Sequence, residues 1–278
     1  MLGSTVPTVG GMEKAFYWGD KWGCEAVQFY ITLSRKWEVD KISEEKIRLF
    51  KDAWKKSNVK EVVAHIPYLV NLVSENEATK EKSVERMISE IERAKVLGVK
   101  YLVLHPGSAG KQDKKDAIKI LKKGFDRVFS KIDPGNVNIL IETMPGQGSS
   151  LGSSFGEIAE ILSVLNNDKV FGVCFDSAHV FEAGYDINKY EETFKEFEKH
   201  ISIKKMKAFH LNDSKTALSS KVDRHEHIGK GKIGLRFFKS LLNDKRFKKI
   251  PKILETPETE EKSEENLKTL KNLIDKKR

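Results

Sequence analysis

Long hydrophobic runs are missing from this sequence of 278 residues. No apolar stretch approaches the ~20 residues that a membrane helix requires, so a transmembrane protein is excluded. Residues 1–11 contain neither a basic segment nor an apolar stretch of signal-peptide length, so we expect no secretory leader. The only two cysteines, Cys24 and Cys174, lie inside apolar, strand-like runs. This scarcity excludes a disulfide-rich scaffold, and we expect a cytoplasmic protein.

The sequence also lacks a low-complexity linker and a hinge rich in proline and serine. Its length exceeds the usual size of one domain but suits one large α/β barrel, so we expect a single domain over residues 1–278. Acidic residues are outnumbered, because 41 Asp and Glu stand against 50 Lys and Arg, a net charge of +9. This excess favours an anionic partner such as nucleic acid, although a coding bias toward lysine would produce the same balance. Helix-turn-helix and Cys/His finger signatures are absent.

Short apolar runs rich in β-branched residues alternate with longer segments of helical periodicity. This alternation predicts βαβ units and a parallel sheet, and eight strands are the number of a closed (β/α)8 TIM barrel. The predicted strands are Met1–Ser4, Cys24–Tyr30, Val62–Ile66, Tyr101–His105, Val137–Thr143, Phe171–Asp176, Lys207–Leu211 and Ile250–Thr256. The predicted helices are Ser43–Ser57, Lys80–Leu97, Asp113–Ile132, Ser154–Leu165, Ile187–Ile203, Gly234–Leu242 and Thr259–Ile274. Ser154 and Glu157 can form a capping box, and Gly98 is placed to end a helix.

Metal-ligating residue types stand at the ends of six consecutive strands. In this kind of barrel the C-terminal strand ends surround the active site, so these side chains should converge. They are His65, His105, Glu142, Asp176, His210 and Glu255, at separations of 34 to 45 residues, or one βα unit each. Any one of them suits a polar barrel rim, but coincidence explains the whole set poorly. Converging carboxylates repel one another unless cations bind, and histidine-rich ligation favours zinc, with manganese or iron possible.

A second group of ligands lies outside the strands. His179 follows Asp176 by three residues, and Asp223 and His225 lie in the polar segment Ser214–Gly231 after the seventh strand. In a locally extended chain Asp223 and His225 face one side while Arg224 faces the other. A polar loop of this kind is usually only a solvated loop, but together with His179 these residues would form a third, separate metal site.

Seven segments together resemble the endonuclease IV family of apurinic/apyrimidinic endonucleases, over nearly the whole chain. Asp-x-His followed by Gly-Lys-Gly is the most specific of them. The segments are His65–Asn71, His105–Ser108, Glu142–Gly148, Asp176–His179, His210–Lys215, Val222–His225 with Ile228–Gly231, and Leu254–Pro257.

The resemblance implies a trinuclear zinc cluster in a DNA-repair enzyme. One zinc would take His65, His105 and Glu142; the second would take Glu142, Asp176, His210 and Glu255; the third would take His179, Asp223 and His225. It further implies cleavage 5′ to abasic sites in duplex DNA, leaving a 3′-hydroxyl and a 5′-deoxyribose phosphate, and trimming of blocked 3′ ends. Glu142 would bridge two metals, and Glu255 could orient the attacking water. A monomer is the default expectation.

By matching position, Arg35, Tyr68 and Leu69 would fill the gap left by a flipped abasic nucleotide. Without the resemblance, a solvated charge and rim packing are the simpler interpretations. Gln147 and Asn212 would contact phosphate or support ligands. Thr5 replaces the family's usual His, and Thr143 its usual Asn, with Pro145 nearby. These departures put the DNA contacts in doubt rather than the metal ligands.

Two other functions remain open. A sugar isomerase or epimerase of the xylose isomerase-like barrels would use one metal held by Glu142, Asp176, His210 and Glu255, but it has no need of the other five ligands. A non-enzymatic DNA-binding barrel would fit the basic charge, but a binder has no need of nine converging ligands.

Overall fold

The computed structural model describes residues 1–32, 37–38 and 40–275. Eight parallel strands close into a barrel in the order β1-β10-β7-β6-β5-β4-β3-β2, which confirms the predicted TIM barrel. The barrel strands are β1 (Leu2–Thr5), β2 (Ala26–Phe29), β3 (Glu61–His65), β4 (Tyr101–Leu104), β5 (Asn138–Glu142), β6 (Phe171–Asp176), β7 (Met206–His210) and β10 (Lys252–Leu254).

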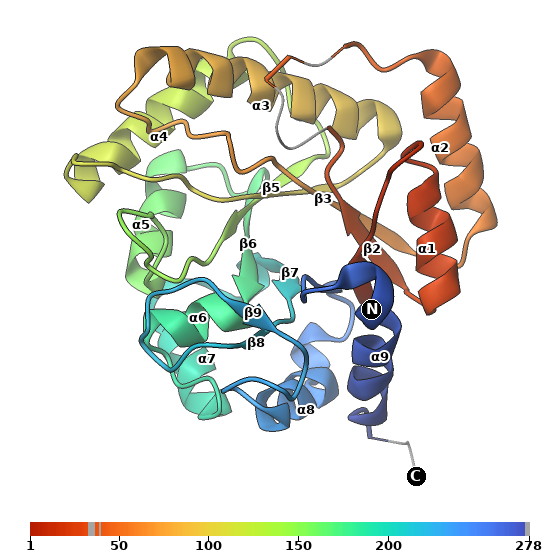
Figure 1. Ribbon diagram of the computed structural model, residues 1–278. Coiled ribbons are helices and arrows are strands. Elements are labelled where there is room, and N and C mark those ends of the chain that lie inside the picture. Colours follow the sequence, from red (N-terminus) through yellow and green to blue (C-terminus); the bar gives the residue numbers. More distant parts are fainter. Residues whose placement is uncertain (33–36, 39, 276–278) are drawn as a thin grey trace.

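Helices surround the barrel on its outside (Figure 1). They are α1 (Lys14–Trp22), α2 (Glu44–Lys56), α3 (Glu77–Leu97), α4 (Lys114–Phe129), α5 (Phe155–Leu165), α6 (Ser177–Ala183), α7 (Tyr190–His200), α8 (Leu235–Asn243) and α9 (Thr259–Asn272). Short 3-10 turns, η1 (Ile203–Lys205) and η2 (Lys245–Phe247), precede β7 and β10. None of the helices within the described ranges is both long and apolar enough to cross a bilayer.

Three elements were not predicted from the sequence. Helix α1 buries Ala15, Phe16, Gly19 and Trp22 on one face, and a side chain at Gly19 would collide with Val27 and Val59. Helix α6 has only seven residues, nearly all buried, and therefore shows no amphipathic pattern. The loop after β7 contains a small antiparallel hairpin, β8 (Asp213–Ser214) and β9 (His225–Glu226), whose strands are too short to show any period.

The helix-end signals are confirmed, with one change. Ser154 accepts a hydrogen bond from the Glu157 backbone N–H at 3.1 Å, and Gly98 ends α3 in the left-handed conformation with φ +81°. The Glu157 carboxylate accepts hydrogen bonds from the N–H groups of Gly152 and Ser153 instead of from that of Ser154. It thus fixes the chain just before the helix, which is the loop that follows the Glu142 strand.

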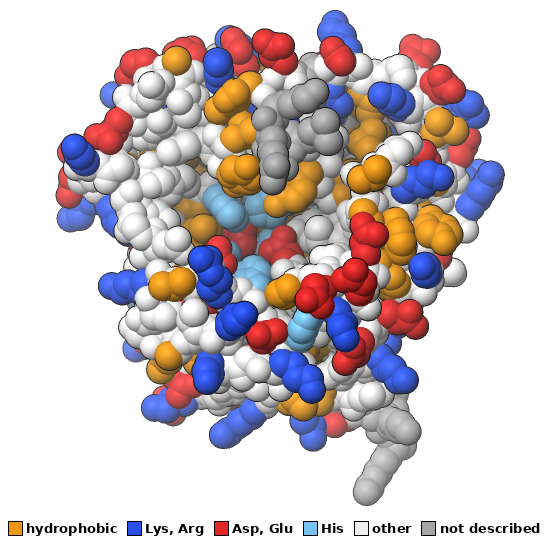
Figure 2. Space-filling model, viewed as in Figure 1, with side chains coloured by type: hydrophobic (Ala, Val, Ile, Leu, Met, Phe, Trp, Pro, Cys, Tyr) orange, Lys and Arg blue, Asp and Glu red, His pale blue; other side chains and the backbone are white. Residues whose placement is uncertain are grey.

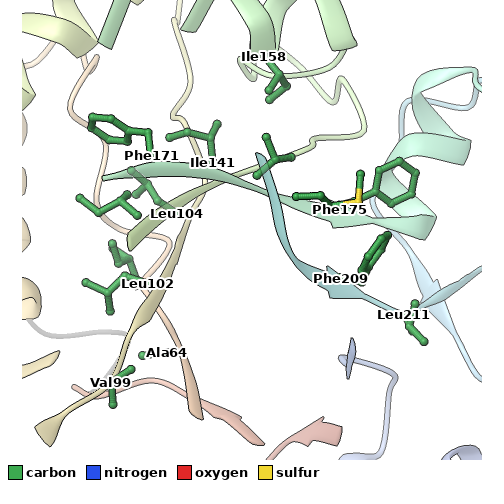
Figure 3. Packing of buried hydrophobic residues seen from close by; sticks show 14 of the residues in the cluster. Ala64, Val99, Leu102, Leu104, Ile141, Ile158, Phe171, Phe175, Phe209 and Leu211 are labelled. Carbon is green, nitrogen blue, oxygen red and sulfur yellow. The ribbon is translucent and has the colours of Figure 1, made fainter. Parts of the chain in front are cut away.

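The main hydrophobic core lies between the strands and the helices. Phe175 on β6 packs against Phe209 on β7 with the rings tilted and their centroids 5.7 Å apart, and Ile141 and Phe171 continue this layer (Figure 3). A second, smaller cluster fills the interior of the barrel, and we call it the interior plug. Its members are Ala26, Val63, Val103, Leu140, Cys174, Ala208 and Ile253, each fully buried. Burial raises the pKa of the Cys174 thiol to about 12, so it remains a neutral, apolar part of the plug.

Candidate metal centre

Each strand-borne candidate lies two residues beyond a member of the interior plug. Because side chains alternate along a strand, this spacing puts them on the inner face, one layer nearer the C-terminal mouth. The pairs are Val63 and His65, Val103 and His105, Leu140 and Glu142, Cys174 and Asp176, Ala208 and His210, and Ile253 and Glu255. Figure 2 shows the result as a hollow with histidine and acidic side chains at its floor.

Three of these residues form the first group of donors. The Nε2 atoms of His65 and His105 each lie 3.1 Å from Glu142 Oε2. On its other side, His65 Nδ1 lies 2.7 Å from the Ile66 carbonyl oxygen, to which it must donate. In the neutral ring, Nε2 therefore points its lone pair at a carboxylate oxygen, and two facing acceptors need a cation between them.

The second group is centred on His210. Its Nδ1 atom lies 2.8 Å from Glu142 Oε1, 3.1 Å from Glu255 Oε2 and 3.7 Å from Asp176 Oδ2. One donor atom from each of these four residues lies within 4.8 Å of the others. Glu142 thus presents one carboxylate oxygen to the first group and the other to the second, which is the geometry of a bridging ligand.

The third group combines a strand-end helix with the hairpin. His179 Nε2 lies 3.3 Å from Asp223 Oδ2, and His225 Nε2 lies 3.4 Å from Asp223 Oδ1. The two Nε2 atoms are 3.3 Å apart, while the two Nδ1 atoms face the carbonyl oxygens of Thr143 and Glu255. Since Nδ1 must be the donor in both rings, neutral rings would face each other with lone pairs, an arrangement that suits a cation. Asp176 also approaches this group, with 3.8 Å between its Oδ2 and His225 Nε2.

The electrostatics of the three groups favour added positive charge. Burial disfavours the charged form of His179, but the surrounding carboxylates, Asp176 first, outweigh it and raise its pKa well above the usual value. Burial likewise opposes ionisation of Glu142, but His210 and His105 hold its pKa well below the usual range. Against the effect of burial, His179 lowers the pKa of Asp223 to about 2. The negative charge that keeps these imidazoles protonated also favours a bound metal ion. The donor set therefore fits divalent cations.

Other side chains hold the hairpin ligands in place. Asp213, fully buried at the start of the hairpin, accepts backbone hydrogen bonds from Ser214, Gly229, Gly231 and Ile233, which organises the Gly-Lys-Gly turn. The side-chain oxygen Oε1 of Gln147 accepts a hydrogen bond from the Asp223 N–H at 2.9 Å.

Glu182 anchors the same segment from α6. Its Oε1 atom accepts hydrogen bonds from the Ser214 hydroxyl, the Thr216 hydroxyl and the Arg224 N–H. Together with the hydrogen bonds from the Ser219 and Lys221 N–H groups to the carbonyl oxygens of Phe181 and Glu182, these contacts tie the hairpin loop to α6.

The departures noted in the sequence have structural roles of their own. Thr143 lies behind the metal ligands rather than in a DNA-facing loop: its hydroxyl accepts the Asp176 N–H at 2.9 Å and its carbonyl oxygen faces His179. Asn212 likewise supports ligands, since its amide donates to Asp176 Oδ2 at 2.7 Å and accepts the Glu255 N–H at 2.8 Å.

The expected DNA-contacting residues are only partly described. Tyr68 is 63% exposed on the loop after β3, where a large apolar side chain is available to a partner. Its neighbour Leu69 is partly buried and packs against the core. Arg35 lies outside the described residues.

The mouth contains one more polar residue, Gln28, that sequence reasoning missed. It is completely buried on β2 and contacts both His210 and Glu255. The signal was present, because Gln28 follows the plug residue Ala26 by two positions. Around it the mouth encloses a pocket of 340 Å³, lined by Thr5, Tyr30, His65, His105, His179, Asp223, His225, Glu255 and Thr259.

Comparison with known proteins shows which family has this arrangement. Residues 16–273 match the family of xylose isomerase-like TIM barrels. A protein of Geobacter sulfurreducens named probable endonuclease 4 is 38% identical over 257 residues, covering 91% of this chain and 87% of that protein. The chain belongs to the endonuclease IV family.

Two further relatives of this endonuclease IV family member extend the comparison. An apurinic-apyrimidinic endonuclease of Caenorhabditis elegans is 38% identical over 261 residues, which cover 92% of this chain and 65% of that protein. The crystal structure of endonuclease IV from Thermus thermophilus superimposes with a TM-score of 0.87 at 30% identity, covering 98% of each chain. The resemblance inferred from the motifs is thereby confirmed.

Proposed function

We propose that this chain hydrolyses the phosphodiester bond 5′ to abasic sites in duplex DNA, and that it also trims blocked 3′ ends. Membership of the endonuclease IV family makes it a DNA-cleaving hydrolase, so the proposal concerns which bond is cleaved and by which groups. The observation that carries it is the convergence of nine donor residues on one barrel mouth: eight form three compact groups with Glu142 shared by two of them, and Asp223 lies 3.3 Å from His179 and 3.4 Å from His225.

The proposed cofactor is three zinc ions per chain, with manganese or iron possible at some positions. The first position takes His65, His105 and Glu142; the second takes Glu142, Asp176, His210 and Glu255; the third takes His179, Asp223 and His225. The number of nitrogen donors supports zinc over magnesium or calcium, which prefer oxygen ligands.

The chain's own side chains define where the chemistry takes place. Bound divalent ions would supply Lewis-acid stabilisation of the phosphate and lower the pKa of a water molecule. Glu142 is fully buried and would hold the ions of the first two positions through one carboxylate oxygen each. Glu255 is less buried and lines the pocket, so its carboxylate is placed to orient the attacking water.

Recognition of the lesion would come from the rim of the mouth. Exposed Tyr68, with Leu69 beside it, is placed to fill the gap left by an extruded abasic nucleotide, and we assign the same role to Arg35. Extrusion of a nucleotide that has lost its base costs less free energy because there is no base to unstack or unpair, which is one source of selectivity. Lys and Arg side chains to the lower left of the hollow, opposite a group of acidic side chains on its right (Figure 2), and the net charge of +9 support phosphate binding. The C. elegans relative is named for the same lesion.

A second candidate is a single-metal sugar isomerase or epimerase. Glu142, Asp176, His210 and Glu255 form a compact quartet that would hold one ion, as that chemistry requires. It leaves His65, His105, His179, Asp223 and His225 without a function, so we rank it below the endonuclease.

We further propose that the chain acts as a monomer in the cytoplasm, on the nucleoid.

The test is incision of a duplex oligonucleotide that carries one abasic-site analogue unable to undergo β-elimination. We expect cleavage on the 5′ side with a 3′-hydroxyl product, and loss of cleavage after chelation that added zinc reverses. Protein that holds its metal ions but leaves the duplex intact would overturn the proposal and favour the sugar enzyme.

A further inference from the structure

We infer that Gln28 is a positioning residue of the metal centre: its side-chain amide selects the nitrogen of His210 that faces the metal and holds Glu255 in place. The inference rests on the proposed metal centre and adds to it a residue that is not itself a ligand. It connects β2, which supplies none of the nine proposed ligands, to the ligands on β7 and β10.

The position of Gln28 matches that of the ligands on the other strands. It follows Ala26 of the interior plug by two residues, as His65 follows Val63 on the neighbouring strand, and Gln28 pairs with Val63 in the sheet. Its side chain is fully buried. A buried amide without partners is costly, so the contacts it makes determine whether it can be accommodated there.

The contacts leave a single orientation for the amide. Gln28 Nε2 lies 2.6 Å from Glu255 Oε1, and a carboxylate that holds a cation through its other oxygen can only accept a hydrogen bond here. The second hydrogen of the same nitrogen points to the Thr5 hydroxyl at 3.2 Å. The nitrogen must therefore face Glu255, and the carbonyl oxygen of Gln28 must face the other way, toward His210.

That orientation in turn fixes the histidine. His210 Nε2 lies 2.9 Å from Gln28 Oε1, which can only accept, so Nε2 must carry the proton. His210 Nδ1 is left with its lone pair, 2.8 Å from Glu142 Oε1 and 3.1 Å from Glu255 Oε2. One amide thus sets the tautomer of one ligand and the direction of another.

Thr5 completes the arrangement. It stands where the family pattern has a histidine, and it accepts the second amide hydrogen through its hydroxyl. A departure from the family pattern thereby becomes part of the support for the second metal position. Residues that orient ligands in this way typically change metal affinity or activity about 10–100-fold when replaced.

The experiment compares two variants with a matched control. Gln28→Met keeps the volume and removes both contacts, whereas Gln28→Glu keeps the acceptor for His210 but loses the donor to Glu255. Gln112→Met makes the same chemical change at a distant glutamine that donates to the Val73 and Ala109 carbonyl oxygens. Zinc affinity is measured by competition with a chelator, the cobalt-substituted proteins are compared by visible absorption, and kcat and KM are measured on the abasic duplex.

We expect Gln28→Met to bind one of the three proposed ions about 10–100-fold more weakly than the wild type. The visible absorption bands of its cobalt-substituted form should also change. Gln28→Glu should alter the cobalt bands and lower kcat with little change in KM, because its carboxylate repels Glu255. Gln112→Met should match the wild type in all three measurements.

Wild-type metal affinity and cobalt spectra in both Gln28 variants would overturn the inference while leaving the proposed function intact. If Gln28→Met does not fold, Gln28→Glu decides alone. A wild-type protein that binds no divalent ion tightly would overturn the proposed function, and the inference with it.

Discussion

The strand-borne and hairpin-borne halves of the metal centre are built differently. Glu142, Asp176 and His210 belong to barrel strands and are completely buried, whereas the side chain of Asp223 is 40% exposed on the hairpin loop. Backbone pairing between neighbouring barrel strands fixes the strand-borne ligands relative to one another, since Glu142 pairs with Cys174 and Asp176 pairs with His210 in the sheet.

The hairpin ligands depend instead on a few side-chain contacts to the loop backbone: Gln147 accepts the Asp223 N–H, Glu182 the Arg224 N–H and Asp213 the Gly229 N–H. Two of the proposed metal positions are thus set by barrel strands, and the third depends on the hairpin loop. We therefore expect the third position to be the most easily lost and the most easily adapted.

The largest effect is expected at the residue shared by two metal positions. Glu142→Gln should keep the fold and bind abasic DNA within about twofold, but lower kcat at least about a thousandfold, equivalent to about 4 kcal/mol. The physical reason is that a neutral amide bridges two cations poorly. Incision kinetics and DNA-binding titrations measure both quantities, and exposed Glu198→Gln is the control. Turnover at the wild-type rate would remove Glu142 from the mechanism.

A smaller loss is expected at the hairpin. Asp223→Asn removes the charge that faces His179 and His225, so it should weaken one metal position and lower kcat about 10–100-fold. The strand-borne positions should keep their ions. Zinc content after dialysis and kcat on the abasic duplex test this, with exposed Asp168→Asn as control. Loss of all the metal would mean that the two halves are not independent.

The rim should affect binding without affecting the metals. Tyr68→Ala removes an exposed ring, and stacking of a base on an aromatic side chain is worth roughly 1–3 kcal/mol. We therefore expect KM for abasic duplex to rise about fivefold or more at unchanged zinc content. Tyr17 on α1 is similarly exposed, at 60% against 63%, and Tyr17→Ala provides the control. Equal effects of both changes would contradict a specific role for Tyr68.

The smallest effect concerns the anchor of the hairpin. Glu182 is buried, and within the described part of the chain its Oε2 atom has no hydrogen-bond partner. Burial raises its pKa above the usual value, so its contribution to stability is complete below the unfolded pKa and is lost as the pH rises through the folded one.

Glu182→Gln should therefore match the wild type near pH 4 and be more stable at pH 8, by about 1 kcal/mol or about 2 °C in Tm. Thermal unfolding of both proteins at the two pH values measures this difference. A variant that is less stable at pH 8 would show that the carboxylate charge itself holds the hairpin.

The sequence predicted that the strand-end side chains converge because two regularities apply there. The apolar strands predicted the barrel, and the metal-ligating residue types at the ends of six strands predicted the mouth. Gln28 obeyed the same regularity and was missed because amides attract less attention than metal-ligating residue types. The hairpin could be predicted only as candidate ligands, since strands of two residues show no period. Its anchors, Glu182 and Asp213, are brought to it by tertiary contacts that no local pattern reports.

The interior plug has a consequence for the order of events in the cell. Seven buried aliphatic, alanine and cysteine side chains close the barrel beneath the ligands, so ions and water exchange through the mouth. That is also the face which the substrate would cover. Metal loading should therefore precede engagement with the duplex, and a bound substrate should shield the ions from chelators until the product departs.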